Sequence, residues 1–463
     1  MTILSPTWTA ILYLVAAVCF ILALKGLSSP KTARRGNLVG AAGALIGVIT
    51  VFLSMKLENI PWIIAAIAVG SAIAAPVARR VQMTQMPQLV AMFNGVGGGA
   101  AALVALLELG HAMEVAGRVD PAVGLAIAFT LLVGSVSFAG SLVTFAKLQE
   151  LMATKPVVFT GLPILMAVVV LAAIAAAVAV ILTGAIWIGV VLIGLGLVAG
   201  VLLVLPVGGA DVPIVISLLN ASTGLAVAAS GLVLGNVLLL VAGTLVGASG
   251  TILTRAMASA MGRSVAGILF GAFRGGSTAG STEASDRPVR SSSAEDVAVL
   301  LGYAQKVVIV PGYGLAVAQG QHTIAELQSA LEERGIEVVF AIHPVAGRMP
   351  GHMNVLLAEA NVPYESLKEM SEVNPEFKTA DVALVVGAND VVNPAAKTTP
   401  GSPIYGMPIL EVDDARQVVF LKRSMRPGFA GIENELLFEP QTTLLFGDAK
   451  DSLTKVLTAV KAL

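Results

Sequence analysis

The sequence is poor in cysteine, in aromatic residues and in charge. Its single cysteine, Cys19, lies in the first apolar run, so the chain has no disulfide framework and no thiolate cluster, and we expect no metal site. Only 12% of the residues are charged, against about 25% in an ordinary soluble domain. Because 56% of the residues are hydrophobic and the mean hydropathy is +0.87, a chain that is soluble over its whole length is excluded.

The charged residues divide the chain into two parts. Residues 1–285 contain 13 Lys and Arg against 7 Asp and Glu, and residues 286–463 contain 15 against 22. The first part is therefore net basic and the second net acidic. We expect two parts suited to different solvents, a lipid membrane and water, and no nucleic-acid partner.

Nine apolar runs fill the first part. They cover residues 8–27, 36–55, 60–77, 87–107, 121–144, 162–182, 185–206, 211–231 and 234–257. Each is close to the roughly 20 residues that cross the hydrocarbon core of a bilayer. The first run has no basic stretch before it and no small-residue cleavage site after it, so it is expected to be a retained helix and not a signal peptide. We therefore predict nine transmembrane helices.

Lysine and arginine gather on one set of connections between these runs. If the N-terminus is outside, the outer connections carry only Lys56 and Arg118, whereas the inner ones carry Lys25, Lys31, Arg34, Arg35, Arg79, Arg80, Lys147, Lys155, Arg255 and Arg263. Positive charge is enriched on cytoplasmic loops. With nine helices, this bias predicts that the C-terminal part lies in the cytoplasm.

After residue 274 the composition changes twice. Residues 274–296 are charged and rich in Gly and Ser, which is typical of a flexible linker. Beyond them, short apolar runs such as 306–311 and 382–386 alternate with amphipathic segments, a pattern that indicates a parallel α/β sheet. The predicted fold is a membrane helical bundle over residues 1–262, a linker over 263–296 and a Rossmann-like domain over 297–463.

A glycine turn follows the first predicted strand. The run KVVIVP leads into Gly312 and Gly314 and then into a helix, which is the setting that a dinucleotide-binding turn requires. Val317 stands at the third position, where such turns have Gly or Ala. A plain tight turn is the alternative interpretation.

Two further features favour NADP over NAD. The second strand ends in FAIHPVAGR, without the carboxylate that holds the ribose 2′-hydroxyl of NAD. Near the end of a later strand, Lys422, Arg423 and Ser424 supply two cations and a hydroxyl that suit a 2′-phosphate. A solvated basic loop is the alternative.

Several segments, taken together, resemble the β subunit of proton-translocating NAD(P) transhydrogenase. They are GYGLAVAQ at 312–319, IHPVAGRMPGHMNVLLAEA at 342–360, VVGANDVVNPAA at 385–396, GMPILEV at 406–412, KRSM at 422–425, LFGDAK at 445–450 and, in the membrane part, GGADVPIVISLLNASTGLAVAASG at 208–231. The resemblance implies reversible hydride transfer from NADH to NADP, driven by protons that enter the cytoplasm across a bacterial inner membrane. It implies that this chain binds NADP(H), and that a partner α subunit with further membrane helices binds NAD(H), in a dimer of αβ units.

The resemblance also implies the cofactor contacts, in a family where the nucleotide lies reversed relative to ordinary Rossmann complexes. The implied residues are Gly312, Tyr313, Gly314, Val345, Ala346, Gly347, Arg348, Met349, Pro350, Gly387, Ala388, Asn389, Asp390, Val391, Gly406, Met407, Lys422, Arg423, Ser424, Met425, Arg426, Pro427, Gly428, Phe429, Asp448 and Ala449. The 422–429 loop resembles a lid over the cofactor. Phe429 stands where many members have Tyr, so a hydroxyl contact is not implied there.

Three polar residues of the membrane part are considered for proton passage. Asp211, at the inner end of the eighth run, can exchange protons with the cytoplasm or simply cap a helix. Asn220 forms a polar and small stripe with Ser217 and Gly224, although contact between helices is the commoner role of such amides. Asn94 stands where some bacterial members carry histidine; an amide does not take up a proton near pH 7, so it is expected to hold water.

The histidines and Asp390 complete the expectations. His111, with Glu108, is expected in an outer loop, so that none of the nine runs contains a histidine. His343 is expected to be structural, because hydride transfer needs no proton at the reacting carbon. Asp390 lies in a predicted cofactor loop, where its protonation would alter nucleotide affinity, or where it merely closes a turn.

Two other functions share this layout. A nucleotide-gated channel or carrier with an NADP-sensing domain is one, although no potassium-filter sequence such as TVGYG is present. A haem-bearing NADPH oxidoreductase is the other, and it would need axial histidine ligands within the membrane runs.

Overall fold

The computed structural model describes residues 4–54, 57, 59–82, 85–117, 119–149, 151–152, 156–208, 211–260, 264–270, 287–347, 351–400, 402, 404–428 and 430–463. Lys56, Arg118, Lys155 and Arg263, which entered the orientation argument, lie outside these ranges. The chain forms two compact units, the first made mainly of residues 1–206 and 215–254 and the second mainly of 255–463. Each unit is described by itself.

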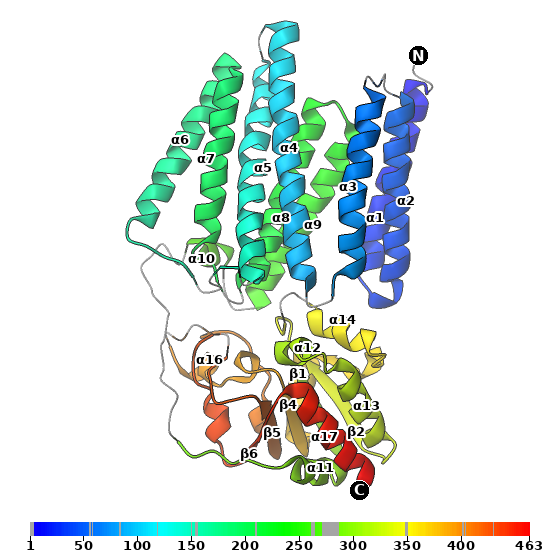
Figure 1. Cartoon of the computed structure of the whole chain (residues 1–463), viewed down its shortest axis with the longest axis vertical. Coiled ribbons are helices and arrows are strands. Elements are labelled where there is room, and N and C mark those ends of the chain that lie inside the picture. The colour runs from blue at the N-terminus through cyan, green and yellow to red at the C-terminus, as the bar shows by residue number, and fades with distance from the viewer. Residues whose placement is uncertain are drawn as a thin grey trace. The chain divides into compact units, whose positions relative to one another are not determined.

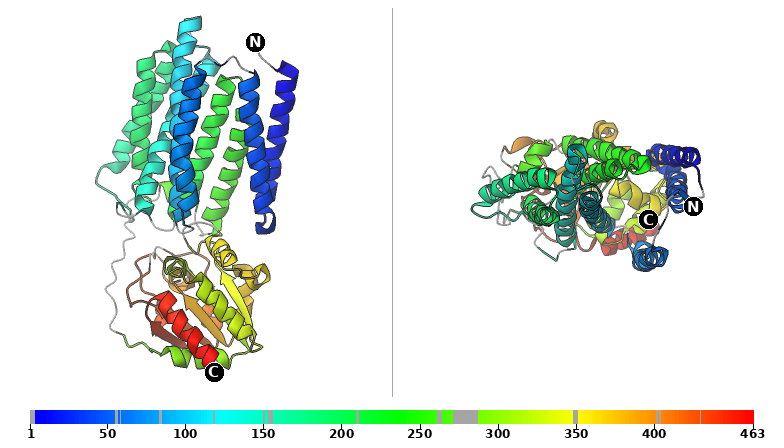
Figure 2. Two further views of the ribbon diagram at one scale, coloured as in Figure 1. Left: turned by 45° about the vertical axis from the view of Figure 1, so that its right-hand side comes forward. Right: turned by 90° about the horizontal axis from the view of Figure 1, so that it is seen from above.

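The described residues contain nine helices that are long and apolar enough to cross a membrane (Figures 1 and 2). They are α1 (Pro6–Leu27), α2 (Pro30–Ser54), α3 (Ile60–Arg80), α4 (Met86–Ala116), α5 (Pro121–Leu148), α6 (Leu162–Thr183), α7 (Ile186–Val204), α8 (Val212–Val233) and α9 (Val237–Ala260). Each coincides with one predicted run, which confirms the predicted helical bundle. A short helix, α10 (Val265–Phe270), follows within the range predicted as linker.

The fourth helix corrects one prediction. α4 continues to Ala116, so Glu108 and His111 lie in its last turns and not in a loop, and the candidate membrane span Met86–Val115 contains a histidine. The helix ends only at Gly117, which adopts a left-handed conformation with φ 65° and is a common helix stop. The apolar run ends earlier because polar residues at a helix end lower the local hydropathy without breaking the helix.

Small residues bring the central helices of this unit into close contact. A Cβ atom added to Gly98 of α4 would lie 2.8 Å from the carbonyl oxygen of Gly134 in α5, and one added to Gly134 would lie 2.6 Å from that of Gly98. α5 also packs against α7, where Gly200 faces the backbone of Val136. Small residues allow helix backbones to approach closely in a membrane. Close packing matters there because apolar side chains gain little by leaving lipid, which is as apolar as they are.

The second unit is a doubly wound sheet of six parallel strands, as predicted (Figure 1). The strands are β1 (Lys306–Pro311), β2 (Glu337–Ile342), β3 (Leu367–Glu369), β4 (Val382–Val386), β5 (Gln417–Lys422) and β6 (Thr442–Phe446). Their order is β3-β2-β1-β4-β5-β6, so the direction of winding reverses between β1 and β4. In such sheets, ligands bind beyond the carboxyl ends of the strands at this reversal.

Alternate residues of the strands bury against different layers. Ile309 and Phe340 face a cluster formed with α11 (Ala294–Gly302), α12 (Tyr313–Val317), α13 (Gln321–Glu332), α14 (His352–Glu359) and α17 (Ala449–Ala462). Val308 and Phe420 face the other cluster, which includes residues of α15 (Met370–Val373) and of the short 3-10 segments η5 (Asn374–Thr379), η7 (Val412–Asp414) and η8 (Glu435–Phe438). The segments η4 (Tyr364–Ser366) and η6 (Asp390–Val392) and the helix α16 (Ala395–Thr398) complete the unit. Burial on both faces explains why the strands are continuous apolar runs.

Candidate functional site

The loops that follow β1 and β4 are locked together at the reversal point. The N–H of Gly312 donates to the carbonyl of Val386 at 2.9 Å, and the N–H of Gly314 donates to that of Gly387 at 2.9 Å. A Cβ atom on Gly314 would lie 2.7 Å from the Cα of Gly387, which itself has φ 69°. Only glycine meets both requirements. The structure therefore brings the predicted turn 312–314 against the predicted loop 387–391.

The loop after β5 lies against the loop after β4. Asp390 accepts hydrogen bonds from the Asn389 side chain at 3.0 Å and from the N–H of Ala430 at 2.8 Å. Lys422 Nζ donates to Asn389 Oδ1 at 3.3 Å and to the carbonyl of Arg426 at 2.8 Å. A Cβ atom on Gly428 would lie 2.5 Å from Asp390 Oδ1. The segment predicted as a lid is thus held at both ends by Asn389 and Asp390.

The two predicted cations differ in their surroundings. Burial lowers the pKa of Lys422, and the nearby charge of Asp390 partly offsets this shift. Arg423 is exposed, and within the described part of the chain its side chain forms no hydrogen bond or ion pair. Lys422 therefore organises the loop from within, whereas the guanidinium of Arg423 is available to an anion outside.

Of the third predicted loop, 345–350, the structure describes residues 345–347. His343 Nδ1 accepts from the N–H of Val345 at 3.2 Å, so its proton resides on Nε2, which lies 2.8 Å from the carbonyl of Pro408. Burial lowers the pKa of this imidazole, which favours its neutral form. This arrangement suits the structural role expected of His343.

The same loop meets residues from distant parts of the sequence. Val345 and Ala430 pack against a small buried cluster that contains Met407. Gly406, the residue before Met407, has φ 83°. The rings of Tyr313 and His352 lie 6.3 Å apart. Val345, Met407 and Ala430, which directly follows the predicted lid, therefore lie in one cluster, and Tyr313 lies beside His352.

The remaining predicted contacts fall into two groups. Asp448 caps α17, where its carboxylate accepts from the N–H groups of Lys450 at 3.0 Å and Asp451 at 3.4 Å. It lies beside the lid, because the N–H of Gly447 donates to the carbonyl of Lys422 at 3.0 Å. The predicted contacts Arg348, Met349, Pro350 and Phe429 lie outside the described residues.

In the membrane unit, two of the predicted polar residues meet. Asn220 of α8 donates to Asn94 Oδ1 of α4 at 3.4 Å, and Asn94 Nδ2 donates to Ser141 Oγ of α5 at 2.9 Å. Asn94 is only 7% exposed. A chain of three polar side chains thus joins three helices inside the bundle.

Separate polar contacts lie along α5 on either side of this chain. At one end, Gln88 of α4 donates to the carbonyl of Leu148 at 3.2 Å. In the other direction, Ser137 Oγ lies 2.6 Å from Thr223 Oγ1 of α8, and Thr130 donates to the carbonyl of Ala226 at 3.3 Å. At 1.5 Å per residue, Thr130 to Leu148 spans about 27 Å, close to the thickness of the hydrocarbon core. Thr130, Ser137 and Ser141 were not identified from the sequence, although their spacing of seven and four residues places them on one face of a helix.

The other predicted membrane residues are placed differently. Ser217 donates to the carbonyl of Gly250, and Gly224 packs against Gly247, so these two face α9 whereas Asn220 faces α4. Asp211 directly precedes α8 and is half-buried. The predicted stripe on α8 therefore serves two neighbouring helices.

Lys147 is a buried cation of the membrane unit, whereas from the sequence it had been counted only as a charge of an inner loop. Lys147, at the end of α5, is 1% exposed. Its Nζ donates to the carbonyls of Val204 at 3.1 Å and Leu205 at 2.6 Å. A cation at these carbonyls caps α7 and opposes the partial negative charge of its C-terminus.

Comparisons with known proteins agree over almost the whole chain. The family described as NAD(P) transhydrogenase beta subunit matches residues 9–459. The NAD(P) transhydrogenase subunit beta of Rhodospirillum rubrum is 49% identical over 463 residues, which cover 99% of this chain and 100% of the relative. The same subunit from a designated strain of that organism gives the same values.

Proposed function

The chain belongs to the NAD(P) transhydrogenase beta subunit family, and from this premise we propose that it exchanges hydride between NADP(H), bound by its second unit, and NAD(H), bound by a partner subunit. When a proton gradient is present across the membrane, we propose that hydride passes from NADH to NADP⁺, driven by protons that enter the cytoplasm. The observation that carries the proposal is the pair of interlocked glycine turns at the reversal point of the sheet.

The residues at this point fit an NADP(H) molecule. Gly312, Gly314 and Gly387 let the loops after β1 and β4 pack against each other, because a Cβ atom on any of them would clash with the backbone of the opposite segment. A glycine turn after the first strand is also where a pyrophosphate approaches the backbone in dinucleotide-binding folds. Arg423 offers an exposed guanidinium for the 2′-phosphate, and the loop that it belongs to would cover the nucleotide. When bound, NADP⁺ accepts a hydride at its nicotinamide ring and NADPH returns it.

Asp390 is the residue that we propose to link protonation to nucleotide affinity. Its carboxylate accepts hydrogen bonds from Asn389 and from Ala430 at the end of the lid, and it lies near the charge of Lys422. A proton on this carboxylate would remove an acceptor and a negative charge from the contact that holds the lid closed. The lid would then open more easily, and affinity for the nucleotide would change with it.

The polar chain through α4, α5 and α8 is the proposed route for protons. Asn94, Asn220 and Ser141 are not groups that titrate near pH 7, so they would pass protons through water molecules that they hold. Buried polar atoms are where water binds inside proteins, and Gln88 Oε1 and Ser230 Oγ are buried with no hydrogen-bond partner among the described residues. Asp211, at the start of α8, is the proposed point of exchange with the cytoplasm.

Assembly and location follow from membership of the family. A beta subunit implies an alpha partner, and we propose that this partner carries the NAD(H) site and further membrane helices in a dimer of αβ units. We also propose a bacterial inner membrane, with the nucleotide unit in the cytoplasm, because of the excess of Lys and Arg on one set of connections.

Reconstitution of the chain with its partner subunit in sealed vesicles tests this function. With the nucleotide unit facing the medium, oxidation of NADPH by NAD⁺ should acidify the lumen, and each nucleotide alone should not. An uncoupler should abolish the pH change while hydride transfer continues. Proton flux on addition of NADP⁺ alone would instead support a nucleotide-gated channel or carrier.

A further inference from the structure

Residues 287–292, here called the edge segment, run along the outer edge of the sheet just before α11. The N–H of Leu444 in β6 donates to the carbonyl of Arg290 at 2.8 Å, and the N–H of Ser292 donates to that of Leu444 at 2.9 Å. Val289 packs against the buried cluster on one face of the sheet. The edge segment, which follows the connection from the membrane unit, is therefore fixed to the rim of the sheet.

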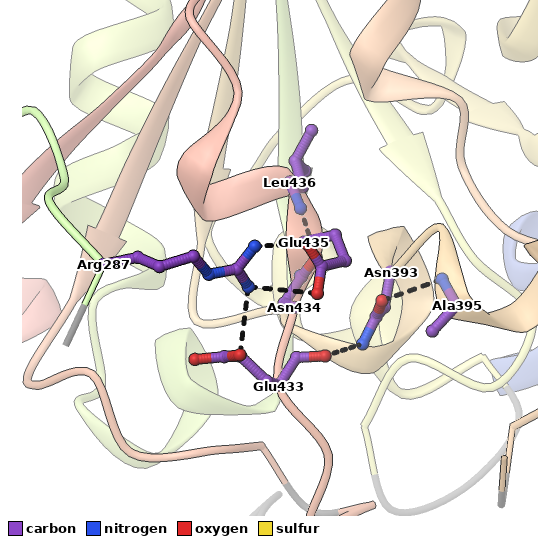
Figure 3. Close-up of polar contacts among 7 residues, drawn as sticks. All are labelled: Arg287, Asn393, Ala395, Glu433, Asn434, Glu435 and Leu436. Atoms are coloured by element: carbon purple, nitrogen blue, oxygen red, sulfur yellow. Dashed lines mark hydrogen bonds and ion pairs between the residues drawn. The ribbon is translucent and has the colours of Figure 1, made fainter. Parts of the chain in front are cut away.

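Arg287, the first residue of the edge segment, makes a forked contact with two carboxylates (Figure 3). Its guanidinium donates to both oxygens of Glu435, at 2.8 and 3.0 Å, and to Glu433 at 3.0 Å. It also lies over the ring of Phe438, 3.8 Å from the centroid. A planar guanidinium is suited to such a combination of bidentate pairing and stacking, whereas a lysine amine is not.

The residues that Arg287 holds, Glu433–Glu435, follow shortly after the proposed lid (422–429) in the chain and are here called the lid base. Within the lid base, Asn434 donates to the carbonyl of Asn389 at 3.1 Å, and the carbonyl of Glu433 accepts from the side chain of Asn393 at 3.0 Å (Figure 3). Asn389 and Asn393 both belong to the loop after β4, which also contains Asp390. The lid base is therefore held by the nucleotide loop on one side and by Arg287 on the other.

We propose that Arg287 is a positioning residue that holds the lid base in place and thereby slows the release of NADP(H). This inference rests on the proposed function of the second unit. Without Arg287, the lid base would lose its contacts with the edge segment, and the carboxylates of Glu433 and Glu435 would no longer share a positive partner. The lid would then open more often, although no group that contacts the nucleotide has changed.

The test is the rate at which the full chain, assembled with its partner, releases bound NADPH after mixing with excess NADP⁺. Arg287→Gln should release NADPH about three- to tenfold faster, the range that two exposed ion pairs support. Release from the unsubstituted protein should accelerate with salt, and this dependence should be weaker in Arg287→Gln because the screened pairs are gone. The exchanged pair Arg287→Glu with Glu435→Arg should restore slow release.

A matched control removes another exposed arginine of the same unit. Arg416→Gln deletes the ion pair with Asp381, 2.9 Å long, at the opposite end of the strands, and it should leave NADPH release unchanged. Unchanged release from Arg287→Gln, or equal acceleration by both variants, would overturn the inference. If the unsubstituted protein retained no NADP(H), the proposed function would fall as well, so the two failures are distinguishable.

Discussion

Replacement of Arg423 by alanine should separate NADP(H) from NAD(H). Arg423 is exposed and, within the described residues, makes no hydrogen bond or ion pair, so its removal breaks no contact of the protein itself. Its neighbour Lys422 is different, because its amine holds Asn389 and the carbonyl of Arg426. Arg423→Ala should therefore weaken binding of the 2′-phosphate alone, whereas Lys422→Ala should also loosen the lid and weaken both nucleotides.

The expected size follows from the kind of bond. A hydrogen bond to a charged group contributes about 1.5–3 kcal/mol, and solvent screening at an exposed guanidinium favours the lower end. A loss of about 1.5 kcal/mol corresponds to about a tenfold rise in the Kd for NADPH. The Kd for NADH should stay the same, so the preference for NADPH, measured as the Kd for NADH divided by the Kd for NADPH, should fall by the same factor.

Calorimetric titration of the detergent-solubilised chain with NADPH and with NADH measures both constants. Arg416→Ala is the control, since it removes an exposed arginine whose partner, Asp381, lies at the other end of β4. An equal loss of affinity for both nucleotides in Arg423→Ala would mean that the residue serves their common part. No loss at all would mean that another group binds the 2′-phosphate.

Three other perturbations test the structure of the two units. The fragment 287–463 should fold alone, because it contains both core clusters of the sheet, and it should bind NADP(H) far better than NAD(H); circular dichroism and nucleotide titration check this. Burial lowers the pKa of His343 below its ordinary 6.5. As the pH falls below 6.5, His343 is therefore protonated in the unfolded chain while it stays neutral in the folded chain. The free energy of unfolding should therefore fall as the pH drops from about 6.5, by at most about 1.4 kcal/mol per pH unit, and His343→Gln should flatten that slope in denaturant titrations. In the membrane unit, Lys147→Met should lower stability by about 1–3 kcal/mol through loss of the bonds to Val204 and Leu205, whereas Lys147→Arg should retain most of it, as thermal unfolding in detergent would measure.

The sequence predicted the helices well because their length is set by the membrane. Each apolar run became one helix, and the largest error was the end of α4, nine residues beyond the predicted boundary at 107. Hydropathy cannot mark such an end, because Glu108 and His111 are polar and yet remain helical until Gly117 changes the backbone conformation.

Two short segments of the second unit have structures that depend on their neighbours. β3 has only three residues, Leu367–Glu369, and it exists because β2 offers a free edge with which it pairs. Residues 407–412 form an apolar run but no strand. Leu410 and Val412 are apolar because they pack beneath the sheet. Pattern alone does not distinguish these two cases.

Local features of the candidate site could be predicted from the sequence, whereas contacts between distant residues could not. Gly312 and Gly314 follow a predicted strand and were recognisable from that context, and Gly387 was implied by the resemblance. The contact of Asn94 with Ser141 depends on how α4 packs against α5, which no local pattern of residues indicates. Arg287 lies in a range that its composition marks as linker, so its contact with Glu433 and Glu435 was not foreseen.

The central claim is that events in the membrane unit control the nucleotide site without taking part in hydride transfer. Two assays on vesicles with the assembled enzyme separate these roles. One measures transhydrogenation driven by a proton gradient. The other measures exchange between NADH and an NAD⁺ analogue through NADP(H) that stays bound, which requires no opening of the site.

Asn220→Leu is the decisive variant, because it removes the hydrogen bond to Asn94 and leaves an apolar group that cannot hold water. We predict that it depresses the driven reaction far more than the exchange, and that Asp211→Asn does the same. Thr244→Val should change neither, since Thr244 is exposed on α9 and, among the described residues, its hydroxyl bonds only the carbonyl of Leu240 in its own helix. An equal fall in both assays for Asn220→Leu would contradict the account, and so would an undiminished driven rate.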